Sequence, residues 1–501
     1  MIYRRNLLSV ATRQRKAGFF VFGDPLRENI MAPLNRKLSA LLACTLTSIC
    51  AFAAQAQAQA EQEKTRILIL SDIGNEPDDS QSLVRFLVYS NEFNVEGLIA
   101  TTSTWLRDRV NPEMMLKRID AYELALPNLR QHAEGYPSAA ALRSVVRAGR
   151  AGYGMDYVGA GKSTAASALI IQSVDKQDTR PLWINVWGGA VDLAQALYDV
   201  RATRSAKEVE AFVSKIRVYA ISDQDNTGEW IRAQFPTLRY ITSIHAWNDY
   251  FIATWSGMSS RFAEGGDMSQ VNNSWLDQQI RNQGPLGAAY PAIEYTMEGD
   301  TPSFLYLLQN GLNAPEHPEY GGWGGRYAAV TPDSRSGLRT STSDTVTGID
   351  GKSHRTASAT IWRWREAYQN DFAARMQWSV TPDVKKANHN PQLVLNGEPG
   401  QGIVELQVKA GEEVKLSARG SHDVDNNRLS YHWWQYKEPT ATTMNIHFGP
   451  DLKLENNQRE ELNFTAPVVK TPTPFHIILQ VQDDGKPSLL AYRRAIVTVT
   501  P

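Results

Sequence analysis

The sequence predicts an α/β fold, a mostly parallel sheet with helices on both faces, followed by an immunoglobulin-like β-sandwich. Short apolar runs alternate with stretches of helical periodicity from residue 65 to about residue 374. From Pro391 onward, short alternating runs follow one another with turn residues between them. A third observation concerns function, because acidic residues crowd the point where the first predicted strand gives way to a helix.

The first domain is expected at residues 64–380. Its strands are expected at 66–70, 95–101, 181–187, 216–221 and 238–244, and its helices at 80–90, 112–124, 165–173, 191–199 and 208–214. Several of these strands are apolar throughout, which is typical of strands buried on both faces. Strands alternating with helices indicate parallel strands joined by helical crossovers. Residues 320–351, rich in Gly, Ser, Thr and Asp, are expected to form long loops.

The second domain is expected at residues 388–501, after a linker at about 382–391. Its strands are expected at 403–408, 413–418, 429–435, 462–466, 476–481 and 495–499. Short runs at this spacing, many of them alternating, predict an antiparallel β-sandwich of immunoglobulin-like type.

The first 60 residues are expected to be an upstream extension and a signal peptide. After Met31, the expected true start, basic residues precede an apolar run and the tract A-Q-A-Q-A-Q-A, which places the signal at about 31–60. The apolar run is shorter than the roughly 20 residues of a membrane span. Both cysteines, Cys44 and Cys50, lie in this segment, and L-L-A-C leaves a lipoprotein signal as the alternative. We therefore expect a periplasmic or secreted protein.

The composition narrows the class of partner. With 42% hydrophobic and 21% charged residues and a formal net charge of −1, the chain resembles an ordinary globular protein. No basic stripe is visible, so nucleic acid is not expected as a partner. No membrane span is expected either, and the sequence leaves the oligomeric state open.

The segment R-I-L-I-L-S-D-I-G-N-E-P-D-D-S, residues 66–80, is the strongest functional signal. Four carboxylates, those of Asp72, Glu76, Asp78 and Asp79, fall between the end of a strand and the first turn of a helix. Acidic residues also favour helix N-termini for structural reasons. Four of them together repel one another unless a cation neutralises them, and a hard, oxygen-liganded ion such as Ca²⁺ fits. The pattern therefore favours a metal or catalytic site.

D-I-G-N-E-P-D-D resembles the amino-terminal signature of the nucleoside hydrolase superfamily, in the longer-turn form D-I-G-N-D-x-D-D. The continuation to E-G-L-I-A-T-T-S-T-W is similar to bacterial secreted cellulose-binding proteins, which carry a nucleoside-hydrolase-like domain and a small β domain. The segments E-G-D-T-P-S-F-L-Y-L-L and G-G-W-G-G-R-Y also resemble that family. The resemblance covers about residues 64–501 and implies a nucleoside-hydrolase-like sheet.

The resemblance implies a role for each matching position. Asp72 matches the aspartate that binds Ca²⁺ and takes a proton from the attacking water, and Asp79 matches the other metal-binding aspartate of the motif. Val191, in W-G-G-A-V-D-L-A, falls where the superfamily donates a backbone carbonyl to the metal. Asp300, in E-G-D-T-P-S, resembles the distal aspartate that completes the site. Asp78 matches the carboxylate that holds a sugar hydroxyl.

One departure from the superfamily affects the leaving group. Typical members have a His immediately before the distal aspartate, where it assists the leaving base, but this chain has Gly299. Glu229, in T-G-E-W, resembles the sugar-binding glutamate region and is a candidate elsewhere. His245 and His317 are further candidates, although structural histidines are commoner than catalytic ones.

Tryptophan is abundant, with 13 residues in the chain. Aromatic faces stack on the C–H surfaces of sugars as on other apolar partners. We expect Trp323 to stack on a sugar, because so glycine-rich a segment as G-G-W-G-G is difficult to place in a core. For Trp187 and Trp247 we favour core packing.

The leading hypothesis is an exported, Ca²⁺-dependent hydrolase of N- or O-glycosidic bonds of furanosyl type, acting on plant or cell-wall saccharides. The alternative is a non-catalytic protein that binds cellulose or another carbohydrate on a nucleoside hydrolase fold. A periplasmic nucleoside scavenger is a third possibility. The expected partner is a carbohydrate or nucleoside substrate, and the claim about substrate depends on analogy.

Overall fold

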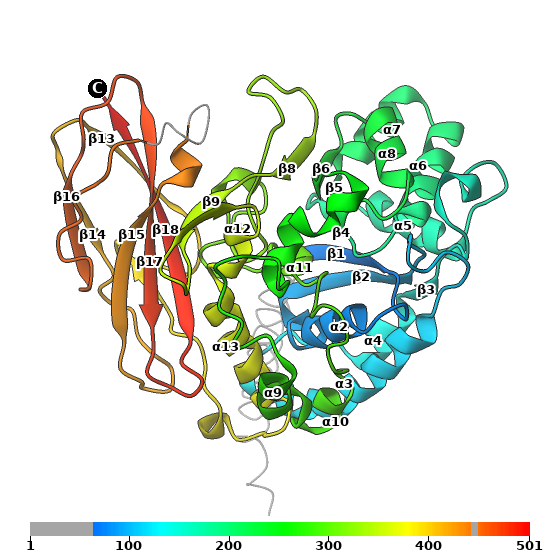
Figure 1. Ribbon diagram of the computed structural model, residues 1–501, viewed down its shortest axis with the longest axis horizontal. Helices are drawn as coiled ribbons and strands as arrows, with labels where there is room; N and C mark the ends of the chain where they lie inside the picture. The colour runs from blue at the N-terminus through cyan, green and yellow to red at the C-terminus, as the bar shows by residue number, and fades with distance from the viewer. Residues whose placement is uncertain (1–63, 442–448) are drawn as a thin grey trace, which may run out of the picture. The chain divides into compact units, whose positions relative to one another are not determined.

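An eight-stranded sheet forms the centre of the α/β part of the protein (Figure 1). The computed structural model describes residues 64–441 and 449–501, so the expected upstream extension, signal peptide and both cysteines lie outside the described residues. In spatial order the strands are β3 (Val146–Ala148), β2 (Phe93–Ala100), β1 (Thr65–Ser71), β4 (Leu182–Val186), β5 (Ile216–Ser222), β6 (Arg239–Ser243), β8 (Leu338–Ser341) and β7 (Tyr327–Ala328). All neighbours pair in parallel except β7 with β8. The mostly parallel sheet predicted from the sequence is confirmed.

Helices cover both faces of this sheet, because successive residues of a strand point to opposite sides. The α-helices are α2 (Asp78–Val88), α3 (Pro112–His132), α4 (Ala139–Ser144), α5 (Ala165–Asp175), α6 (Val191–Thr203), α7 (Ala206–Ser214), α8 (Thr227–Gln234), α9 (Asn273–Leu276), α10 (Gly284–Ala288), α11 (Pro302–Leu305), α12 (Ala359–Trp362) and α13 (Arg365–Trp378). In β1, Ile67 and Ile69 join one hydrophobic cluster with α2 and α3, whereas Leu68 and Leu70 join another with α5 and α6. Among the described residues, no helix is both long and apolar enough to span a membrane.

The long loops expected at residues 320–351 are partly wrong. This segment contains β7, β8 and β9 (Asp344–Thr347), and β9 pairs antiparallel with β10 (Ser353–Thr356). These strands are short and largely polar, and many of their residues are half-buried or exposed. They therefore lack the continuous apolar run by which central strands are found in a sequence.

The C-terminal part folds into a four-stranded and a two-stranded sheet around a separate hydrophobic cluster. The larger sheet has the order β13 (Val404–Lys409), β18 (Leu490–Thr500), β17 (Thr473–Gln482) and β15 (Ser430–Tyr436), and the smaller pairs β14 (Glu413–Ser417) with β16 (Glu461–Thr465). A short pair, β11 (Val394–Leu395) and β12 (Glu398–Pro399), precedes them. The expected antiparallel arrangement needs one correction, since β13 and β18 pair in parallel. These two strands are far apart in the sequence, so no hairpin constrains their direction.

The sandwich is joined to the α/β part by buried hydrogen bonds, and Lys64–Pro501 forms one compact unit. Arg494 of β18 donates to the carbonyl oxygens of Leu312 (2.8 Å) and Gly321 (2.9 Å). The Tyr436 hydroxyl donates to Asp344 Oδ2 at 2.6 Å. The domain boundaries at residues 380 and 388 remain predictions.

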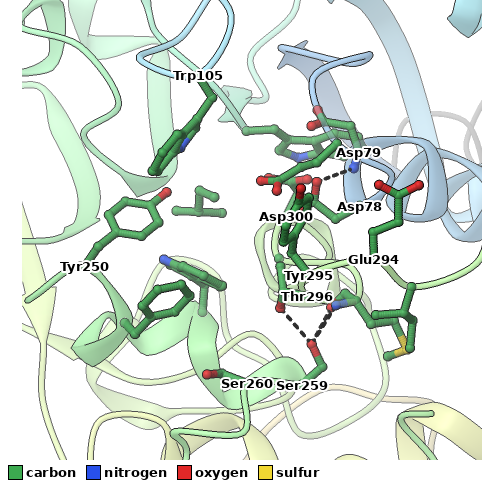
Figure 2. Close-up of a pocket in the computed structure, with 18 of the residues that line it drawn as sticks. Asp78, Asp79, Trp105, Tyr250, Ser259, Ser260, Glu294, Tyr295, Thr296 and Asp300 are labelled. Atoms are coloured by element: carbon green, nitrogen blue, oxygen red, sulfur yellow. Dashed lines mark hydrogen bonds between the residues drawn. The ribbon is translucent and has the colours of Figure 1, made fainter.

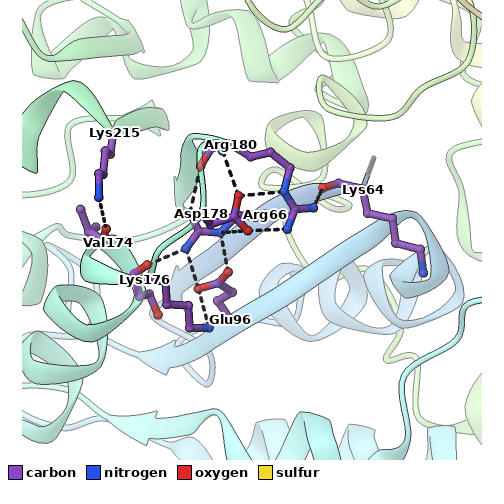
Figure 3. Close-up of polar contacts among 9 residues, drawn as sticks. Lys64, Arg66, Glu96, Val174, Lys176, Asp178, Arg180 and Lys215 are labelled. Atoms are coloured by element: carbon purple, nitrogen blue, oxygen red, sulfur yellow. Dashed lines mark hydrogen bonds and ion pairs between the residues drawn. The ribbon is translucent and has the colours of Figure 1, made fainter. Parts of the chain in front are cut away.

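A polar network holds the amino end of β1 (Figure 3). Arg66 Nε lies 2.6 Å from Glu96 Oε1, and Lys176 Nζ lies 2.9 Å from Glu96 Oε2. Arg66 also donates to the Arg180 carbonyl at 2.9 Å, and Arg180 pairs with Asp178 at 2.6 Å. This network, in which Arg66 and Glu96 are buried and Lys176 is exposed, ties β1 to β2 and to the segment after α5, at the end of the strand opposite to Asp72.

Candidate functional site

The acidic motif lies at the carboxyl end of β1, in the interior of the sheet. The turn that leaves the strand is tight, because Gly74 has a φ of +102° and a Cβ there would lie 2.5 Å from the Asn111 amide. Asn111 in turn donates to the Ile73 carbonyl at 2.8 Å. A residue with a side chain would be strained at position 74, so the Gly-Asn-Glu-Pro turn is adapted to bring α2 back toward the strand.

Asp300 reaches the motif from the segment before α11, more than 200 residues further along the chain. One oxygen from each of Asp78, Asp79 and Asp300 lies within 4.8 Å of the others (Figure 2). The Ser71 hydroxyl donates to Asp79 Oδ1, and the Asp79 backbone N–H donates to Asp78 Oδ1 at 3.0 Å. The other carboxyl oxygens of these residues thus remain available to face a ligand.

Asp72, expected as a metal ligand, lies beside this group of three but is not part of it, whereas Asp78, expected to hold a sugar hydroxyl, is. A Cβ at Gly188 would lie 2.6 Å from Asp72 Oδ1, so the glycine leaves room for the carboxyl group. Burial raises the pKa of Asp72 to about 7, although a hydrogen bond with Ser103 opposes the effect. A side chain at position 188 would therefore collide with the Asp72 carboxyl group, so close packing at the site requires glycine there.

The carboxylates are deeply buried and lack positively charged partners. Burial raises the pKa values of Asp78, Asp79 and Asp300 well above their usual range, and repulsion among the aspartates adds to the rise. Asp300 Oδ2 is buried without a hydrogen-bond partner. Within residues 64–441 and 449–501, no Lys or Arg forms an ion pair with any of these aspartates. Buried carboxylates of this kind are stabilised by a cation, and the all-oxygen donor set fits Ca²⁺.

A cavity of about 860 Å³ opens in front of the aspartates. Trp105 and Tyr250 line it on the side that faces the aspartates (Figure 2), and Trp255 is a further aromatic residue of the lining. Trp187 also lines the cavity and donates from Nε1 to the Ser303 hydroxyl at 2.8 Å. Carboxylates on one side and aromatic faces on the other suit a ligand with both hydroxyl groups and C–H surfaces, such as a sugar.

Trp323 is buried in the core, contrary to the expectation from the sequence. The side chain is only 2% exposed, does not line the cavity, and lies edge-on to Tyr368 and Tyr492 in the core. The surrounding glycines are required by close packing rather than by exposure. A Cβ at Gly324 would lie 2.3 Å from the Pro302 carbonyl, and one at Gly322 would lie 1.9 Å from Asn313 Oδ1.

Two further predicted site residues lie outside the lining of the cavity. Val191 begins α6 with its side chain buried in the hydrophobic cluster of the opposite face, and the role of its carbonyl remains a prediction. Glu229 is exposed in the first turn of α8, and its sugar contact also remains a prediction. Trp187 is buried as expected, whereas Trp247 is 49% exposed, so core packing is wrong for Trp247.

Gly299 faces the cavity at the position where the superfamily has histidine. A Cβ at this position would lie 3.1 Å from Asp78 Oδ2 and 3.3 Å from the Trp255 ring. Trp255 donates from Nε1 to the Ser222 hydroxyl at 3.2 Å, which holds its ring in place. A side chain at position 299 would therefore begin in tight contact with a carboxyl oxygen and an aromatic ring.

Several cavity residues were not expected from the sequence, and Gln224 is the most informative of them. Its Nε2 donates to the Trp187 carbonyl at 2.6 Å, and its buried Oε1 has no partner. Gln224 follows the end of β5, at the same sheet edge as Asp72. Its position after an apolar strand was the available signal, because ligand sites of α/β sheets collect at that edge.

Comparison with known proteins identifies two matching regions. The model of the cellulose-binding Sde182 family's nucleoside hydrolase-like domain matches residues 66–327, and that of the cellulose-binding protein Sde0182 C-terminal domain matches 413–499. The solved structure of a nucleoside hydrolase-related hypothetical protein from Saccharophagus degradans, described as associated with carbohydrate metabolism, is 37% identical. The match covers 87% of this chain and 100% of that chain with a TM-score of 0.74.

Other likenesses are weaker. The effector protein XOO4466 aligns at 10% identity over 66% of this chain and 98% of its own, with a TM-score of 0.32. The PKD domain from KIAA 1837 protein aligns at 21% identity over 19% of this chain and 80% of its own, with a TM-score of 0.14. Neither carries an argument, and no curated protein matches the chain.

The family model of the first domain spans more than half of the chain, and the Saccharophagus degradans protein is matched over its whole length. The chain therefore belongs to the cellulose-binding Sde182 family, with its nucleoside hydrolase-like domain and its C-terminal domain.

Proposed function

We propose that this protein is an exported, Ca²⁺-dependent hydrolase of N- or O-glycosidic bonds of a furanosyl-type sugar in plant or cell-wall saccharides. The observation that carries the proposal is the convergence of Asp78, Asp79 and Asp300 on one cavity, with Asp72 beside them. The export part rests on the predicted signal peptide.

The cation would be held by Asp78, Asp79 and Asp300, with Asp72 adjacent. A bound Ca²⁺ supplies positive charge that orients sugar hydroxyls and makes a water molecule more acidic. Asp72 then acts as the base that accepts the proton of the attacking water. Asp78 accepts a hydrogen bond from a sugar hydroxyl and fixes the ring.

The bond breaks through a transition state with oxocarbenium character, in which positive charge develops at the anomeric carbon. The buried carboxylates stabilise that charge, because electrostatic interactions are strong in a site shielded from water. Tyr250 and Trp255 offer their faces to the sugar and exclude water from the opposite side. Gly299 has no side chain that could protonate the leaving group. The site therefore favours leaving groups that depart without a proton from this position.

The second candidate is a carbohydrate-binding protein without catalysis. Gly299 in place of histidine favours it, as does the name of the family. The two candidates share the sugar ligand and differ only in whether the glycosidic bond breaks.

Release of reducing sugar or free base from nucleosides, arabinofuranosides and cell-wall polysaccharides tests the proposal. We expect hydrolysis with Ca²⁺, loss with EDTA, and loss in Asp79→Ala. The matched control is Asp333→Ala, which removes an exposed carboxylate outside the cavity. Hydrolysis that persists with EDTA and in Asp79→Ala contradicts the mechanism. No hydrolysis on any substrate, together with retention on cellulose, favours the binding protein.

A further inference from the structure

A second cavity of about 490 Å³ adjoins the one that holds the aspartates. The two cavities share Phe251 and Phe262 in their walls, so a ligand that fills one contacts side chains of the other. The first cavity alone, at about 860 Å³, has the size of a pocket for a whole small-molecule ligand. The second therefore offers room that a single nucleoside does not require.

A row of aromatic rings connects the two cavities. Trp105 lies 5.4 Å from Trp247, Trp247 lies 5.0 Å from Tyr250, and Tyr250 lies 6.0 Å from Phe251, as measured between ring centroids. Phe251 lies 5.3 Å from Phe262. Phe251 and Phe262 are 47% and 58% exposed, and the two tryptophans are about half exposed. Large aromatic side chains that remain exposed side by side indicate a binding surface rather than a core.

The polar groups of the second cavity identify the kind of ligand. Asn248, Ser256 and Thr356 offer hydrogen-bond donors and acceptors beside the aromatic rings. Among the described residues, Asp249 is the only charged side chain that lines this cavity, whereas Arg261 lines the first cavity, with its guanidinium carbon 5.0 Å from the centroid of the Phe262 ring. A polyanion such as a nucleic acid or an acidic polysaccharide depends on basic side chains for affinity. Alternating rings and neutral polar groups instead suit the faces and hydroxyls of neutral sugars.

We infer that the two cavities form one groove for a neutral saccharide chain, with the reacting sugar at the aspartates and the next units over Phe251 and Phe262. The inference rests on the proposed function for the placement of the reacting sugar. It extends the proposed function by placing the further sugar units of the chain in the second cavity. Phe262 is then a residue that selects for chain length.

Calorimetric titration of the full-length protein with two ladders of neutral oligosaccharides, cello-oligosaccharides and arabinofuranosyl oligosaccharides, tests the inference. For at least one ladder, we expect affinity to rise with each added unit from the monosaccharide until the groove is filled. In Phe262→Ala, affinity for the longer chains should fall about tenfold and affinity for the monosaccharide should fall less, because Phe262 borders the second cavity as well as the first. The control Leu124→Ala, which shortens an exposed apolar side chain on α3, should behave as wild type.

Affinity independent of chain length in both ladders overturns the inference, as does Phe262→Ala with unchanged affinity for long chains. Tighter binding of an acidic ladder such as oligogalacturonides also overturns it, because the groove is then not selective for neutral chains. Hydrolysis is assayed separately on the same samples. Binding that depends on chain length without hydrolysis retains the groove and removes the proposed enzyme, so the two failures are distinguishable.

Discussion

At the scale of single residues, the site is governed by carboxylates that are buried close together. Asp78, Asp79 and Asp300 have raised pKa values because burial disfavours the charged form and their neighbours repel it. Such a cluster lowers the stability of the folded protein in the absence of a cation, and a bound cation raises it. Function and stability therefore make opposite demands on the same side chains.

Asp72→Asn tests that opposition. In EDTA we expect the variant to be more stable than wild type, with a Tm higher by a few degrees, because one of the crowded carboxyl groups becomes neutral. With Ca²⁺ we expect no turnover, since the amide accepts no proton from water. Calorimetry and the sugar-release assay provide the two measurements. A Tm in EDTA below that of wild type, or retained turnover, contradicts the assigned role.

Gly299→His tests whether the missing histidine can be restored. We expect activity to fall at least about tenfold rather than rise, because the new side chain meets Asp78 and the Trp255 ring. The measurement is kcat on the best substrate from the panel and on nucleosides. Gly299→Ala is the control, and we expect a smaller loss of activity because its side chain is shorter. Enhanced nucleoside hydrolysis in Gly299→His would contradict this expectation, because it would show that the Trp255 ring moves to accommodate the histidine.

At the scale of elements, α2 links the two segments of the chain that carry the acidic group. The helix carries Asp78 and Asp79 in its first turn, and Arg85 two turns later pairs with Glu298 at 2.8 Å. Glu298 has an unusual φ of +54°, and its carboxylate also accepts a hydrogen bond from the Tyr290 hydroxyl at 2.6 Å. Because Glu298 lies two residues before Asp300, this buried pair fixes the distal aspartate against the helix.

Glu298→Gln removes the charge that compensates Arg85. We expect a loss of about 3 kcal/mol in the free energy of unfolding, because a buried guanidinium is left without its partner. Affinity for Ca²⁺ should fall as well, since Asp300 is less firmly placed. Denaturant unfolding and calcium titration measure both effects. The control Glu316→Gln disrupts a more exposed ion pair with Arg217 and should cost less than about 1 kcal/mol. Equal losses in the two variants would refute the positioning role.

At the scale of the whole molecule, the sandwich and the α/β part share a junction that excludes water. His476 of β17 is buried there, accepts a hydrogen bond at Nδ1 from Arg494 at 3.0 Å, and lies edge-on to Tyr320. Burial lowers the pKa of His476 well below its ordinary value, and the nearby charges of Arg494 and His317 add to the effect. The junction is therefore adapted to a neutral imidazole.

Acid should weaken this junction. The unfolded chain binds a proton at His476 below about pH 6.5, whereas the folded chain does not, so this residue lowers the stability as the pH falls through that value. We expect His476→Gln, which keeps an acceptor for Arg494, to lose less Tm than wild type between about pH 7 and pH 5. The exposed His422 provides the control variant His422→Gln. Parallel loss of Tm in wild type and His476→Gln contradicts this account.

The sequence by itself determined the buried strands β1, β2, β4, β5 and β6 with most of the helices between them, the change to a β-rich second part, and the acidic motif after the first strand. These features depend on local periodicity and on residues close together in the chain, and their signals survive in a single sequence. The motif E-G-D-T-P-S also supplied Asp300 through resemblance, although spacing alone could not bring it to Asp78 and Asp79.

Only the tertiary structure decided which aromatic side chains reach the cavity. Trp323 lies in a glycine-rich segment because other backbone passes close to it, and the same glycines in a sequence are equally compatible with an exposed loop. Trp255, Tyr250 and Gln224 come from separate segments, and their convergence depends on contacts between distant parts of the chain. The strands β7 to β10 were missed because they are short and largely polar, whereas the parallel pairing of β13 with β18 joins distant parts of the chain. Long-range pairing leaves no periodic trace in the residues that take part.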